Sequence, residues 1–143
     1  MRDGLLDPGS HGGPASAGLL LLRAAIGAMM LAGHGWGKLV GFGTGAASFP
    51  DPLRIGHGAS MAATIGAEFF CSLLVVVGFG TRIAVLPLVF TMAIAAFVVL
   101  GGHPWADQEL AVAYLVPFAA LAFTGAGRYS MDAVVVERLR VKS

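Results

Sequence analysis

The sequence predicts an all-α integral membrane protein, a four-helix bundle with both termini in the cytoplasm. Hydrophobic residues make up 57% of the 143 residues, charged residues make up 12%, and the mean hydropathy is +0.81. So few charges cannot cover a soluble domain of this size, and lipid must therefore cover much of the surface. Four apolar runs approach the roughly 20 residues that a helix needs to cross the hydrocarbon core of a bilayer.

The predicted helices are separated by stretches rich in glycine and proline, which act as turns. The last run is the shortest and carries Pro117, which a membrane helix tolerates where neighbouring helices satisfy the freed carbonyl group. The four predicted spans are Ala17–Val40, His57–Phe79, Ile83–Gly101 and Gln108–Thr124.

The orientation follows from the positive charges. Seven of the nine Lys and Arg residues fall on the side of the termini and the second loop, whereas Lys38 and Arg54 lie opposite. The positive-inside rule therefore predicts a multi-pass protein of the plasma membrane, or bacterial inner membrane, with cytoplasmic termini. Residues 1–16 are expected to form a flexible tail, residues 17–132 the helical domain, and residues 133–143 an amphipathic tail along the inner membrane surface.

Composition also excludes several classes of function. The net charge of +1 provides no basic surface for nucleic acid. Cys71 is the single cysteine, so the chain has no internal disulfide and no CxxC redox or zinc motif. Histidines and carboxylates cluster at the predicted outer ends, but no HxxH, HxxxH or HxxxE pair provides the ligand spacing usual for a metal on one helix, so we expect no metal site.

Ionisable residues within the first span form a stripe. Arg23, Gly27, Met30, His34 and Lys38 are spaced four, three, four and four residues apart, which places them on one helical face. Charged residues are costly in lipid, so this face should turn toward protein, and Gly27 should let another helix approach closely.

Glu68 is predicted near the middle of the second span, where a carboxylate is most costly. It needs a partner or it takes up a proton, and Arg23 and His34 are the candidate partners. One interpretation is a structural Arg23–Glu68 bridge between two helices. The other is a carboxylate that handles protons or binds a ligand, since ionisable residues inside a membrane are functional by default.

These side chains suit a quinone headgroup. A ring carbonyl needs donors such as His34 or Lys38, and redox cycling needs a proton acceptor such as Glu68 or Glu109. We predict Glu68 and His34 as catalytic residues. The predicted ligand-binding residues are Arg23, Lys38, His103 and Glu109, with a quinone as the expected ligand and no covalently bound cofactor.

Four short motifs together resemble the DoxX family. They are His34–Lys38 at the end of the first span, Glu68 in the second, Gly78–Arg82 after it, and Gly125–Asp132 after the fourth span. The resemblance extends from about Gly18 to Asp132. It implies a small four-helix membrane protein of bacteria or archaea, some of whose relatives are subunits of a thiosulfate:quinone oxidoreductase.

The leading hypothesis is a redox-associated membrane subunit that binds a quinone or a small reductant and works with a partner oxidoreductase. Arg82 and Asp132, both matched by the resemblance, are expected to be structural: Arg82 at lipid phosphates and Asp132 near a helix start. One alternative is a non-catalytic membrane anchor or scaffold for soluble redox or stress-defence enzymes. Another is a small transporter with Glu68 as its protonatable centre, which would require a homo-oligomer.

Overall fold

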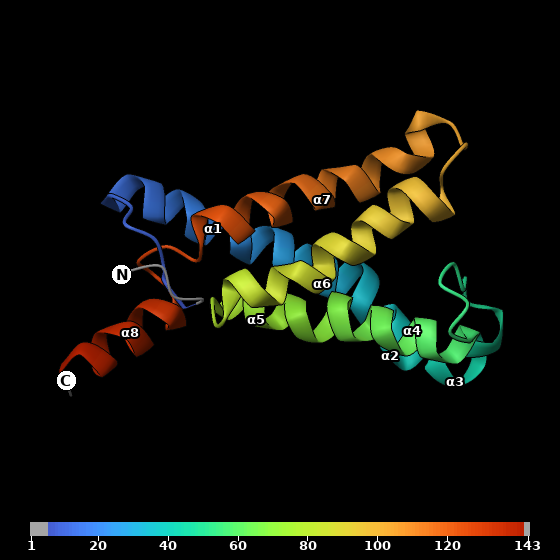
Figure 1. Ribbon diagram of the computed structural model, residues 1–143, viewed down its shortest axis with the longest axis horizontal. Coiled ribbons are helices and arrows are strands. Elements are labelled where there is room, and N and C mark those ends of the chain that lie inside the picture. Colours follow the sequence, from blue (N-terminus) through green and yellow to red (C-terminus); the bar gives the residue numbers. More distant parts are fainter. Residues whose placement is uncertain (1–5, 142–143) are drawn as a thin grey trace.

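The protein is an elongated bundle of helices. The computed structural model describes residues 6–141, and every regular element in that range is helical. Figure 1 shows the start of α1 and the C-terminal helix α8 at one end, called here the termini end. The connections that follow α2 and α6 lie at the opposite end, the loop end. Within residues 6–141, four helices are long and apolar enough to cross a membrane, so the predicted all-α, multi-pass fold is confirmed.

The four spans are built from α-helices, and three of them also contain π-helical segments. Span 1 comprises α1 (Gly13–Met30), the π-helical segment Leu31–Gly35 and α2 (Trp36–Val40). Span 2 comprises α4 (His57–Ile65), the π-helical segment Gly66–Cys71 and α5 (Ser72–Val77). Span 3 comprises α6 (Thr81–Ile94) and the π-helical segment Ala95–Val99, and span 4 is α7 (Trp105–Thr124). The short helix α3 (Phe42–Gly45) and a 3-10 turn (Ala46–Ser48) follow span 1, and α8 (Met131–Val141) follows span 4.

The spans begin and end within a few residues of the predicted positions. Span 1 begins at Gly13, four residues before the expected Ala17, because Pro14 suits the first helical turn. Span 2 ends at Val77 because Gly78 adopts a left-handed conformation, with φ of 73°. The next N–H group, that of Phe79, then donates to the carbonyl of Leu74 at 3.0 Å, which closes the helix end.

The residues before α1 are held against the loop that follows span 4. The N–H of Gly127 donates to the Pro8 carbonyl at 2.8 Å, and His11 Nε2 lies 2.9 Å from the Thr124 carbonyl oxygen. Arg82 Nε also donates to the Asp7 carbonyl at 3.2 Å. Residues 7–12 therefore lead into α1 with some of their polar groups bonded to Arg82 of α6 and to Thr124 and Gly127 at and after the end of α7.

Two buried charged side chains join the helix ends at the termini end. The guanidinium of Arg23 donates to the carbonyls of Val75 and Val76, at 3.1 and 2.5 Å, and to that of Tyr129. The first two carbonyls belong to the last turn of span 2, where helical partners are missing. Asp132 accepts hydrogen bonds from the N–H groups of Gly80 and Thr81, at 2.6 and 3.1 Å, at the start of α6. Both buried side chains thus provide hydrogen-bond partners for backbone groups at helix ends, Arg23 for carbonyls and Asp132 for N–H groups.

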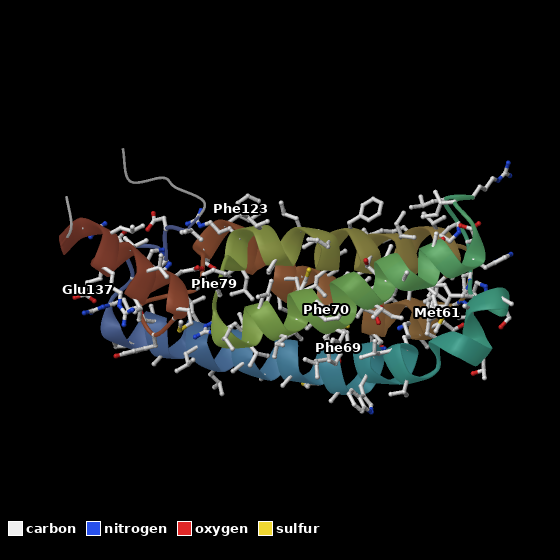
Figure 2. All side chains as sticks on the ribbon, turned by 90° about the horizontal axis from the view of Figure 1, so that it is seen from below. Met61, Phe69, Phe70, Phe79, Phe123 and Glu137 are labelled. Carbon is white, nitrogen blue, oxygen red and sulfur yellow. The ribbon has the colours of Figure 1, made fainter. Side chains whose placement is uncertain are left out.

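The surface of the bundle is largely apolar. Figure 2 shows side chains projecting along its whole length, and Phe123 is 82% exposed. In a bilayer such side chains face lipid. The interior is filled by fully buried residues from all four spans, which are Met30, Val75, Val85, Leu88, Phe118 and Leu121.

Spans 1 and 2 approach most closely at two glycines. A Cβ at Gly27 would lie 2.8 Å from Val76 Cγ2, a contact that fits the close approach predicted for this glycine. A Cβ at Gly35 would lie 2.5 Å from the backbone carbonyl oxygen of Glu68. The second contact is with backbone rather than with a flexible side chain, so it sets the distance between the two helices at Glu68.

We expect Gly35→Ala to destabilise the bundle by about 1–3 kcal/mol, because the added methyl group must push Glu68 and span 2 away. Thermal unfolding of the purified protein in detergent would measure the loss. Gly33→Ala is the matched control, because it lies in the same π-helical segment and a Cβ there would meet nothing within 4 Å. Equal stability of the two variants would contradict the close contact.

Candidate functional site

The buried carboxylate of Glu68 is paired with Lys38. Lys38 Nζ lies 2.5 Å from Glu68 Oε2, and the side chains are 25% and 4% exposed, respectively. A carboxylate taken this far from water requires a close cation or hydrogen-bond donors. Lys38 supplies both, from the last turn of span 1.

The expected pairing of Glu68 with Arg23 or His34 is therefore wrong. Spans 1 and 2 run in opposite directions, and the contact between Gly35 and Glu68 sets their register. Arg23 lies 12 residues before Gly35, or about 18 Å along the helix, so it reaches the end of span 2 instead. Residues of the stripe predicted on span 1 therefore belong to two separate clusters, with Arg23 in one and Lys38 in the other.

Both members of the ion pair lie in or next to π-helical segments. Glu68 is within Gly66–Cys71, and Lys38 follows Leu31–Gly35 in the first turn of α2. A π-helical turn holds more residues than an α-helical turn, and such segments occur frequently at functional sites. The ion pair therefore lies where both helices depart locally from the α-helical period.

The ion pair lines a cavity of about 380 Å³. The cavity lies between spans 2 and 3, under the loop of residues 49–55 at the loop end. Ala63 of span 2 and Phe90 of span 3 line it and are also exposed, so it opens sideways between these spans, where lipid would be. Lys38 and Glu68 are the only charged side chains among the described residues that line it. The other lining residues are Phe49, Pro50, Pro52, Leu53, Ile55, Ser60, Ala63, Thr64, Ala67, Pro87, Phe90, Thr91, Ile94, Ala95 and Val99.

Asp51 fixes the loop that covers the cavity. Its carboxylate accepts hydrogen bonds from the Ser60 hydroxyl at 2.6 Å and from the N–H groups of Ile55 and Gly56 at 3.0 and 2.8 Å. The hydrogen bond from Ser60, helped by these two N–H groups, lowers the pKa of Asp51 below its ordinary value. The ionised carboxylate therefore ties the loop to the start of span 2.

The other predicted site residues lie outside the cavity. His34 packs edge-on against the Tyr114 ring of span 4, with ring centroids 5.3 Å apart. His103 is exposed beside Asp107, at 3.7 Å, and Glu109 is exposed in the first turns of α7. Neither residue lines the cavity.

Arg23, Arg82 and Asp132 belong to the termini end, where each bonds to backbone groups. Asp132 lies in the first turn of α8, as expected, and its carboxylate also accepts the hydrogen bonds at the start of α6. Sequence analysis missed the roles of Asp51 and of Thr91, which lines the cavity on span 3. The Pro50-Asp51-Pro52 turn could have drawn attention to Asp51, whereas a single threonine in an apolar span carries no distinctive pattern.

The comparison with family models identifies the chain. The DoxX model matches residues 18–101, which is more than half of the sequence. The chain belongs to the DoxX family. The match contains Lys38, Glu68 and every residue that lines the cavity, and it ends before α7. No curated protein and no solved structure matches this DoxX protein.

A double-mutant cycle tests the ion pair. We expect Lys38→Met alone to lower the free energy of unfolding by about 3 kcal/mol, because Glu68 then remains buried without its cation. The double variant Lys38→Met/Glu68→Gln should recover much of that loss, which gives a large coupling energy in thermal or denaturant unfolding. Arg23→Met combined with Glu68→Gln is the control and should be additive. Coupling of Glu68 to Arg23 instead of Lys38 would overturn the assigned pair.

The loop should lose stability in acid. Because folding lowers the pKa of Asp51, its contribution is complete above the ordinary aspartate pKa of about 4 and disappears as the pH falls through the lower folded value. The melting temperature of Asp51→Asn should therefore lie below that of the unaltered protein at pH 6, and the gap should narrow at acidic pH. Ser60→Ala removes the hydrogen bond that lowers the pKa of Asp51 most. In the Ser60→Ala background, the melting-temperature difference caused by Asp51→Asn should therefore change less with pH. A gap that is independent of pH would contradict this account.

Proposed function

We propose that this DoxX protein is a redox-associated membrane subunit that binds a quinone in the cavity beside Lys38 and Glu68. The observation that carries the proposal is a charged pair placed in the wall of an otherwise apolar cavity between two membrane spans. Ligand sites are typically apolar pockets of 300–1,000 Å³ with a few convergent polar groups, and this cavity fits that description. Its sideways opening suits a ligand whose isoprenoid tail stays in lipid.

The two charged residues would have distinct roles. The Lys38 ammonium would donate a hydrogen bond to one carbonyl oxygen of the quinone, and the Glu68 carboxylate would accept the proton of a quinol hydroxyl. The quinone supplies the two-electron chemistry when it is bound. The chain's own residues orient the ring, keep water from it and hold the proton at Glu68 Oε2.

His34 enters the proposal in a supporting role. It packs against Tyr114 of span 4 and does not line the cavity, so it would help to hold span 1 in place rather than contact the ligand. Because His103 and Glu109 are exposed outside the lining, the ligand-binding role expected for them is not part of the proposed site.

A partner oxidoreductase would exchange electrons with the bound quinone. The single cysteine provides no dithiol to store electrons within this chain. The exposed Arg128 and Arg138 at the termini end support the predicted cytoplasmic placement of that end, where a soluble partner would dock.

Titration with a short-tailed quinone in nanodiscs tests the proposal. We expect saturable binding to the unaltered protein and at least tenfold weaker binding to Lys38→Met/Glu68→Gln, which removes both charges together and so leaves neither buried alone. His103→Ala is the matched control and should bind normally. Melting temperatures measured on the same samples would show that each variant is folded. Absence of binding to the folded, unaltered protein would refute the proposed function.

A scaffold role is the second candidate, and the position of α8 favours it. This helix leaves the bundle at the termini end and exposes Glu137, Arg138 and Leu139, a mixed surface on which a soluble enzyme could dock (Figure 1). In that case the Lys38–Glu68 pair would serve only to hold spans 1 and 2 together, and charge removal would change stability without changing a binding activity.

A further inference from the structure

Three hydroxyl side chains line the cavity, and one of them has no partner. Ser60 donates to Asp51 Oδ1 at 2.6 Å, and Thr64 donates to the Ser60 carbonyl at 2.9 Å. Within the part of the chain that the structure describes, the hydroxyl of Thr91 makes no hydrogen bond. Thr91 is therefore the one uncommitted hydroxyl in the lining.

Thr91 differs in this respect from the threonines in the middle or at the end of other spans. Such residues commonly donate to the carbonyl four positions earlier, as Thr64 does and as Thr124 does to Ala120 at 3.0 Å. The corresponding carbonyl for Thr91 belongs to Pro87, and the bond is not made. A hydroxyl without a partner is costly in an apolar environment. A ligand group that forms a hydrogen bond with the Thr91 hydroxyl would therefore bind favourably.

Thr91 lies on a different wall from the charged pair. Lys38 and Glu68 come from spans 1 and 2, whereas Thr91 comes from span 3, on a wall otherwise formed by apolar residues. The lining between these polar points is apolar, with Ala67 on span 2 and Ile94 on span 3. The cavity therefore has hydrogen-bonding side chains on two of its walls, the charged pair on spans 1 and 2 and the Thr91 hydroxyl on span 3.

We propose that Thr91 is the second anchoring point for the ligand, and that the cavity selects a flat ring with oxygen atoms at opposite edges, as in a para-quinone. One oxygen would meet Lys38 and Glu68, and the other would accept a hydrogen bond from the Thr91 hydroxyl. Phe49 of the covering loop and Phe90 of span 3 would contact the apolar parts of the ring and tail. This inference rests on the proposed function and adds the ligand class that the same site recognises.

The test compares two threonines in one cavity. Thr91→Val keeps the shape of the side chain and removes the hydroxyl, and Thr64→Val does the same where the hydroxyl is already bound within its own helix. With a para-benzoquinone carrying a decyl tail, we expect Thr91→Val to weaken binding about fivefold, Thr64→Val to change it less than twofold, and Thr91→Ser to retain most of it.

A second probe separates loss of the hydrogen bond from disturbed packing. A para-decylphenol has a single ring oxygen, so it can meet the charged pair or Thr91 but not both. Its affinity should be nearly the same for Thr91→Val and the unaltered protein. Equal weakening of both ligands, or equal quinone affinity in Thr91→Val and the unaltered protein, would overturn the role of Thr91. The proposed function would survive either result, whereas absence of quinone binding to the unaltered protein would refute both.

Discussion

The energetic cost of placing the carboxylate of Glu68 inside a membrane protein constrains the rest of the structure. An unpaired charge at this depth would oppose folding, so spans 1 and 2 must meet where Lys38 can reach it. Gly35 makes that meeting possible, because its missing side chain lets span 1 rest against the backbone of Glu68. The position of the pair then sets the register of the two helices, and with it the place of Arg23 at the opposite end.

A second polar cluster closes the other end of the bundle. Arg23 occupies carbonyls at the end of span 2, and Asp132 occupies N–H groups at the start of α6. Two of the glycine-rich motifs therefore have a structural explanation: residues 78–82 and 125–132 form turns whose backbone groups these charged side chains satisfy. Glycine is needed at position 78 for two reasons, because its φ is positive and because a Cβ there would lie 2.6 Å from the Arg23 guanidinium.

The charged groups at the two ends of the bundle differ in what they contact. At the termini end Arg23 and Asp132 bond to backbone groups, and neither side chain lines the cavity. At the loop end Lys38 and Glu68 bond to each other and also line a space with apolar walls. Charged groups that line a cavity can exchange one partner for another, and this property distinguishes a candidate site from a purely structural cluster.

The sequence alone determined the number of spans, their approximate limits and the presence of costly charges within them, because hydropathy and turn residues act locally. It also identified Lys38 and Glu68 as candidate site residues, and Gly27 as a position where another helix packs closely against span 1. Only the tertiary structure decided that Glu68 pairs with Lys38 instead of Arg23. That choice depends on the register between two antiparallel helices, which is set by contacts between segments distant in sequence such as that of Gly35 with Glu68. The same reason explains Thr91, an ordinary residue of an apolar span until packing places its hydroxyl in a cavity shared with a charged pair.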